Sequence, residues 1–239
     1  METNVSEIWV YLSSSPLFGL TLTLVAYCIA HGIYTHSGGH PLCNPVLLSI
    51  IMIITVLVLT NIEYPHYFAG AQYIHFLLGP VTVALGYPLY RQLTKLKQLW
   101  LPISAALISG IIVGTISSIL LVRWLGGSIE VQLSIAPKSV TAPVAMGIAE
   151  KIGGLASLTA ALVITTGIIG ALICTIIFKV MRTKDDSIKG IALGLSAHGI
   201  GTARAFYLSK EMGAFSGLAM ALSALLTALI LPCLISYLF

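Results

Sequence analysis

Residues 132–151 read QLSIAPKSVTAPVAMGIAEK, an apolar stretch of membrane-span length that two prolines and a lysine interrupt. Pro137 and Pro143 each remove a backbone donor and disturb helical geometry, so we expect the chain to leave the helix between them. Backbone that leaves a helix at membrane depth must be buried in protein or face a wet cavity, because lipid cannot satisfy its polar groups. The stretch therefore predicts a broken or re-entrant helix beside a cavity.

The composition of the whole chain indicates that this element belongs to a membrane protein. The chain has 239 residues, of which 57% are hydrophobic and only 8% charged, whereas soluble domains are about 25% charged. Twelve Lys and Arg and eight Asp and Glu residues cannot cover the surface of a soluble particle. The net charge of +4 is spread over short loops without a basic stripe, so nucleic acid is not an expected partner. We expect an all-α, polytopic helix bundle in the lipid bilayer.

Long apolar runs define the expected spans. Since a spanning helix needs about 20 mostly apolar residues, five stretches qualify: 16–36, 45–62, 100–123, 155–180 and 213–238. Two further stretches resemble 132–151 in being apolar but interrupted. These are 74–91, with Pro80, Thr82 and Pro88, and 190–210, with Gly199 and Gly201.

Spacing suggests that these elements repeat within a single integral membrane domain covering residues 1–239. A shift of 60 residues aligns 153–163 with 213–223 and 138–140 with 198–200. Each unit would be a broken element followed by a full span, at about 74–123, 132–180 and 190–238. The alternative is coincidence, because small-residue patterns recur easily in membrane helices.

Loop charge bears on how the units cross the membrane. If every element spans, the loop cations divide evenly between the two faces, against the positive-inside rule. If the second and third broken elements dip in and return, most cations lie on one, cytoplasmic, face. That reading inverts successive units, as in many secondary transporters with a substrate site at discontinuous helices. Broken helices that cross the membrane are the alternative.

Two cations at membrane depth are the main candidates for function. Lys138 and Arg204 both lie in otherwise apolar stretches, where a cation costs about 2.5–3.5 kcal/mol on insertion scales and usually has a functional partner. An anionic substrate would supply that partner. Alternatively, the two side chains extend to the interface or pair with an acid. The acids available for this are Glu130, Glu150 and Glu211.

The breaks also supply hydrogen-bond donors for an anion. The candidate binding residues beside Lys138 and Arg204 are Ser139, Thr141, His198, Gly199, Gly201 and Thr202. A half-helix that starts in a break directs its positive end inward, which favours a carboxylate or phosphate. The alternative is that Pro and Gly only kink packed helices. The first broken element has no cation, so we expect it to act as scaffold.

Other chemistry has little support. Glu150 and His198 are possible proton carriers, with an interfacial charge and a buried polar residue as the respective alternatives. His31, His36 and His40 are crowded, but Gly38 and Gly39 break the helix between the last two, so no metal site is expected. No nucleotide-binding loop, H-E-x-x-H or G-x-S-x-G motif occurs. We therefore expect no enzyme activity and no cofactor.

Four sequence strings occur in this order: NPVLLSIIMIITVLVLT (44–60), FLLGPVTVALGYPLYRQL (76–93), SIAPKSVTAPVAMGIAEKIGG (134–154) and ALGLSAHGIGTARAFYLSKEMG (192–213). Together they resemble the LrgB/CidB family. The resemblance covers most of the chain from Asn44 onward. It implies a bacterial inner-membrane protein that is holin-like or antiholin-like and linked to control of murein hydrolases. It also implies a possible small LrgA/CidA-like membrane partner. A related plastid-envelope protein exchanges glycolate and glycerate, and bacterial relatives have been linked to pyruvate.

The family's most recognisable strings fall on the two breaks, at Pro137–Pro143 and His198–Arg204. One departure is Gly147, where an acidic residue is common in the family; any proton role there would pass to Glu150. Two functions therefore compete. One is a secondary transporter of small monocarboxylates such as glycolate, glycerate, pyruvate or lactate. The other is a holin-like or antiholin-like protein. The uniformly apolar full spans favour transport, and we expect a homo-oligomer, with a dimer favoured.

Overall fold

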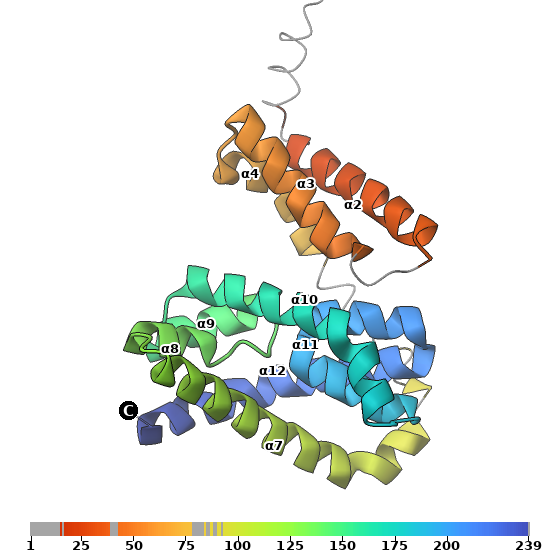
Figure 1. Ribbon diagram of the computed structural model, residues 1–239, viewed down its shortest axis with the longest axis vertical. Helices are drawn as coiled ribbons and strands as arrows, with labels where there is room; N and C mark the ends of the chain where they lie inside the picture. Colours follow the sequence, from red (N-terminus) through yellow and green to blue (C-terminus); the bar gives the residue numbers. More distant parts are fainter. Residues whose placement is uncertain are drawn as a thin grey trace, which may run out of the picture. The chain divides into compact units, whose positions relative to one another are not determined.

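The computed structural model describes residues 15, 17–38, 43–77, 84, 87, 90–91 and 93–238, and all regular elements in these residues are α-helices. The chain divides into two compact units, Met1–Ala84 and Leu85–Phe239 (Figure 1). The all-α fold is confirmed. The three-unit repeat and the single domain stay predictions, and Pro80, Thr82 and Pro88 lie outside the described residues.

The first unit contains α2 (Phe18–His36), α3 (Pro45–Thr60) and α4 (Tyr64–Phe76). Helix α3 begins where the side chain of Asn44 accepts hydrogen bonds from two backbone N–H groups, and Pro45 fits its first turn. Helices α2 and α4 are joined by a 2.7 Å hydrogen bond between Thr23 Oγ1 and Tyr67 Oη. The sequence did not predict α4, because its polar and aromatic residues interrupt any apolar run.

The second unit contains α7 (Leu93–Trp124), α8 (Ile129–Ile135), α9 (Ala142–Ile152), α10 (Ala156–Val180), α11 (Asp186–Leu208) and α12 (Lys210–Leu238). Among the described residues, α2, α7, α10 and α12 are long and apolar enough to cross a membrane. Helix α3 has 16 residues, a length of about 24 Å against a hydrocarbon core of about 30 Å. Four of the five expected spans therefore have full length.

The stretch 132–151 is broken as predicted. Helix α8 ends before Pro137, and α9 begins after Thr141, whose extended backbone (φ −62°, ψ 146°) forms the N-cap. The chain then returns to the end of α8, because the backbone N–H of Leu155 donates to Ser134 Oγ (2.8 Å) and Thr159 Oγ1 donates to the Ser134 carbonyl (2.9 Å). Residues 129–152 therefore form a hairpin, the α8–α9 hairpin.

Helix α11 is also folded back on itself. Its backbone breaks at His198 (φ 40°, ψ −128°), a conformation that residues other than glycine rarely adopt. Lys95 Nζ lies 3.3 Å from Asp185, just before α11, and 2.7 Å from Glu211, just after it. Because one lysine reaches both ends of α11, these ends lie together and residues 186–208 form a second hairpin, the α11 hairpin.

The two hairpins approach each other from opposite ends of the second unit. Along α7, Lys95 meets the root of the α11 hairpin and Gly110 lies against Leu195, close to its tip. A turn later, Thr115 Oγ1 donates to the carbonyl of Ala136 in the α8–α9 hairpin (3.3 Å). In Figure 1, the α8–α9 hairpin lies near the C-terminal end of α7. The hairpin tips thus meet near the middle of α7.

Candidate functional site

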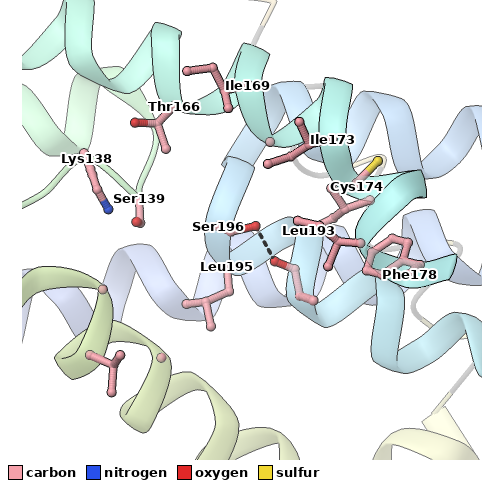
Figure 2. Close-up of a pocket in the computed structure, with 16 residues that line it drawn as sticks. Lys138, Ser139, Thr166, Ile169, Ile173, Cys174, Phe178, Leu193, Leu195 and Ser196 are labelled. Atoms are coloured by element: carbon pink, nitrogen blue, oxygen red, sulfur yellow. Dashed lines mark hydrogen bonds between the residues drawn. The ribbon is translucent and has the colours of Figure 1, made fainter. Parts of the chain in front are cut away.

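A cavity of about 590 Å³ opens where the two hairpin tips meet. Helices α7 and α10 form its walls, and each hairpin contributes residues close to its break (Figure 2). The lining is mostly apolar. Its polar and small members are Gly110, Gly114, Lys138, Ser139, Thr166, Gly170, Cys174 and Ser196. The volume lies in the range of small-molecule sites, about 300–1,000 Å³.

Lys138 is the cation of this cavity. The fully buried Pro137 ends the preceding turn, and the half-buried Lys138 follows it. Figure 2 shows the Lys138 and Ser139 side chains directed toward the space in front of Leu195 and Ser196. Within the part of the chain that the structure describes, Lys138 Nζ makes no ion pair and no hydrogen bond. A cation at this depth without an internal partner is typical of a site for an anion.

Hydroxyl groups add neutral donors around Lys138. Ser139 Oγ and Thr166 Oγ1 make no hydrogen bond to any described residue. Ser196 Oγ donates to the Ala192 carbonyl (2.6 Å) and keeps its lone pairs. One ammonium group and two free hydroxyl donors in an apolar cavity suit a small monoanion better than a neutral or cationic ligand.

His198 lies at the tip of the α11 hairpin but is held by α10. The residue is 4% exposed, and its Nε2 lies 3.0 Å from the Val163 carbonyl oxygen. Gly167 makes room for the ring, because a Cβ there would lie 2.7 Å from His198 Cε1. His198 is not among the residues that line the cavity. This environment is that of an anchor for the hairpin tip.

Thr202 and the glycines support the same tip. Thr202 Oγ1 donates to the His198 carbonyl (2.8 Å) and lies 2.9 Å from Ser216 Oγ of α12. Gly201 lets the two halves of the hairpin approach, since a Cβ there would lie 2.8 Å from the Leu193 carbonyl oxygen. Gly199 is exposed. None of these three residues lines the cavity.

Arg204 is half-buried on the second half of α11. Its guanidinium lies 5.6 Å from the centre of the Tyr207 ring and interacts with the thiol of Cys174, which lines the cavity. Arg204 itself is not a lining residue. Glu211, one of the acids considered as its partner, is bound to Lys95. Arg204 thus lies behind Cys174, one side chain away from the cavity.

The start of α9 lies in the break beside Lys138. Thr141 is its N-cap but its hydroxyl makes no capping bond, and Pro143 occupies the first turn. Glu150 is exposed in the last turn of α9, about 12 Å along the helix axis from its start. Glu150 is not among the lining residues of the cavity.

Helix α10 contributes residues to the cavity that were not predicted from the sequence. Thr166, Gly170 and Cys174 recur at four-residue spacing, which places them on one face of a helix. This row of small and polar residues within an apolar span is the sequence pattern that could have indicated a cavity-facing side of α10. The span contains no helix break, which was the feature used to predict the site.

Comparisons with known proteins agree with the resemblance of the sequence motifs. The model of the LrgB-like family matches residues 23–237. YwbG of Bacillus subtilis is 33% identical, over 92% of this chain and 98% of its own. "Holin-like protein CidB" of Staphylococcus epidermidis is 31% identical, over 90% and 94%, and "Antiholin-like protein LrgB" of Bacillus cereus is 30% identical, over 91% and 95%.

No solved structure matches the chain. The family model covers almost all of the second unit and most of the first, and four helices in the described residues are long and apolar enough to span a membrane. The chain therefore belongs to the LrgB-like family and is a multi-pass bacterial membrane protein.

Proposed function

We propose that the second unit is a secondary transporter that binds a small monocarboxylate in the cavity between the hairpin tips. The observation that carries the proposal is Lys138, which faces the cavity without an ion pair or hydrogen bond to any described residue. A bound carboxylate would neutralise the charge of Lys138 and accept hydrogen bonds from the hydroxyl groups of Ser139 and Thr166. Hairpins that meet from opposite sides at a central site are typical of secondary transporters.

The substrate class follows from the charge of the site. One cation balances one negative charge, and the apolar walls offer nothing to pair with a second. Glycolate, glycerate, pyruvate and lactate each have one carboxylate and a short remainder with an oxygen atom. Lys138, Ser139 and Thr166 would bind the carboxylate. Ser196 Oγ, on the other hairpin, would accept a hydrogen bond from the substrate hydroxyl that glycolate, glycerate and lactate carry. Arg204 would act through Cys174, and His198 and Thr202 would hold the tip.

The test is uptake of labelled glycolate, glycerate, pyruvate and lactate into proteoliposomes of the pure protein. Lys138→Gln removes the charge and should reduce uptake and ligand-induced thermal stabilisation at least tenfold, since a charge-assisted hydrogen bond contributes about 1.5–3 kcal/mol. The matched control is Lys151→Gln, which removes an exposed lysine from the far end of α9. Wild-type uptake by a folded Lys138→Gln protein would refute the proposal.

A second candidate function rests on the relatives' names. Proteins 31% and 30% identical to this chain are called holin-like and antiholin-like, which favours a role in lysis or in control of murein hydrolases. Such a protein would act through oligomers, a homodimer being the smallest, and with an LrgA/CidA-like partner. Release of an entrapped neutral dye from the same proteoliposomes, equal in wild type and Lys138→Gln, would support this function over transport.

A further inference from the structure

A second hollow lies at the end of the second unit where α10 ends and α11 begins. Its volume is about 370 Å³, and its walls come from α10, the following loop, both ends of α11 and the start of α12. The polar residues that line it are Thr175, Lys179, Thr183, Asp186 and Lys189. Phe178 lines both this hollow and the central cavity.

The charges of this hollow leave one cation uncompensated. Lys189 Nζ lies 2.8 Å from Asp186 Oδ1, so this pair is neutral. In the described ranges, Lys179 Nζ has no ion pair or hydrogen bond, and neither the Thr175 nor the Thr183 hydroxyl has a hydrogen-bond partner. The hollow thus presents a free ammonium group and two free hydroxyl donors to the same space.

The surroundings of the hollow are also cationic and lie at the edge of the apolar surface. The loop after α10 adds Arg182 and Lys184, whereas its acid Asp185 is engaged by Lys95 and Ser187. The last turns of α10 expose Ile176 and Val180. Since α10 is a candidate span, the hollow lies where the hydrocarbon region gives way to the headgroup layer.

We propose that this hollow binds the phosphate group of an anionic phospholipid. Lysine is a common phosphate ligand, and cation clusters next to a membrane span attract anionic lipids. Lys179, Thr175 and Thr183 would bind the phosphate, and Phe178, Leu208 and Met212 provide an apolar wall for the glycerol and upper acyl chains. A lipid seated there contacts α10, α12 and both ends of the α11 hairpin, and so fixes the root of that hairpin.

The experiment measures lipid retention by native mass spectrometry and the melting temperature of the full-length protein in a nonionic detergent. Phosphatidylglycerol, phosphatidylethanolamine and glycerol 3-phosphate are added in parallel. The variant is Lys179→Gln, whose side chain is exposed, so that folding should be preserved. The matched control is Lys184→Gln, which removes the same charge from the adjacent loop but does not line the hollow.

Phosphatidylglycerol should bind and raise the melting temperature, and Lys179→Gln should weaken its binding about tenfold. Lys184→Gln should change phosphatidylglycerol binding less than about threefold. In a neutral micelle, unlike an anionic membrane, a cation outside the hollow is not attracted by a surface potential. Equal losses in both variants, or equal retention of phosphatidylethanolamine, would overturn the site. Glycerol 3-phosphate binding as tightly as the lipid would overturn the lipid assignment and leave a soluble phosphate ester as the ligand.

Discussion

The tips of the two hairpins break the helix in different ways and leave their polar residues in different states. In the α8–α9 hairpin, Pro137 and the residues up to Thr141 form a short loop, and Lys138 Nζ has no partner among the described residues. In the α11 hairpin, the break is one residue, His198, whose ring binds the Val163 carbonyl. A 60-residue shift aligns these two positions.

The sequence predicted anion-binding residues at both tips, whereas the structure shows that the two tips differ. A tip whose polar groups are satisfied internally has a fixed position, because displacing it would leave buried groups unpaired. A tip with an unsatisfied cation is stable only with a ligand or water nearby. The α11 tip is therefore the side of the cavity that internal contacts fix, and we expect the α8–α9 tip to be the side that recognises the proposed substrate.

The largest effect is expected from loss of the His198 anchor. His198→Ala removes a buried ring and its bond to α10 and should cost about 3 kcal/mol, in the range of large-to-small core substitutions. Thermal or denaturant unfolding in detergent measures this loss. Amide hydrogen exchange should rise at residues 195–205 and stay unchanged in α8 and α9.

Gly167→Ala provides an independent test of the same anchor, because its Cβ would overlap the His198 ring and should cost about 1–3 kcal/mol. The matched control is Gly147→Ala on α9, where nothing lies within 4 Å of an added Cβ; it should be neutral or slightly stabilising. Similar destabilisation by the two alanines would contradict the anchoring role.

The second effect has the opposite sign and concerns the recognising tip. Lys138→Met replaces the unpaired ammonium by an apolar side chain of similar length and should stabilise the ligand-free protein by up to about 2 kcal/mol. It should also abolish the thermal shift produced by ligand. Lys151→Met, at an exposed position, should change stability by less than about 0.5 kcal/mol. A clear loss of stability in Lys138→Met would mean that Lys138 has an internal role.

A smaller effect is expected at Thr202, which joins the α11 hairpin to α12. Thr202→Val keeps the shape but loses the bonds to the His198 carbonyl and Ser216, so it should cost about 1 kcal/mol. The comparison is Thr165→Val on α10, whose hydroxyl is exposed and bonds only its own helix. Equal unfolding midpoints for the two variants would remove Thr202 from the anchor.

The smallest effect is expected at the root of the α11 hairpin. Hydrogen bonds from Ser187 and the nearby Lys95 lower the pKa of Asp185 to about 2. Its contribution to stability is therefore complete when the pH is above the pKa of Asp in the unfolded chain, near 3.9. The contribution is lost only as the pH falls through about 2. Asp185→Asn keeps the N-cap but loses the ion pair, which at 44% exposure contributes about 0.2–1 kcal/mol.

The stability difference between wild type and Asp185→Asn should be the same at pH 7 and pH 5, because Asp185 stays ionised at both. Unfolding midpoints at the two pH values measure it. A difference that shrinks between pH 7 and pH 5 would show that the carboxylate titrates in that window and that the root of the hairpin responds to mild acid.

Local signals in the sequence predicted the helix breaks and the residues of one tip. Two prolines around a lysine predicted the first break. Lys138 and Ser139 line the cavity, and their role in binding a substrate stays a prediction. Gly199 and Gly201 indicated the second break, but the backbone leaves helical geometry at His198. Gly201 instead lies where the two halves of the hairpin touch. Helix α7 begins at Leu93, earlier than expected, because its first turns are amphipathic.

The remaining properties of the site depend on tertiary contacts that no local pattern records. His198 has the same residue type whether it binds a ligand or the Val163 carbonyl, and only the position of α10 decides between these roles. Thr166 has the same residue type as the neighbouring Thr165, and only the position of α10 beside both tips places Thr166 in the cavity. Whether Arg204 and Glu150 take part in binding or proton transfer stays a prediction.

The hairpins also constrain how the protein enters the membrane. The first half of α11, residues 186–197, is about 18 Å long and cannot span the hydrocarbon core, and lipid cannot satisfy the backbone at its tip. Ser216, the partner of Thr202, belongs to α12 and is synthesised after the hairpin. The α11 hairpin therefore cannot reach its final position before α12 has been synthesised, because Ser216 is the hydroxyl partner of Thr202.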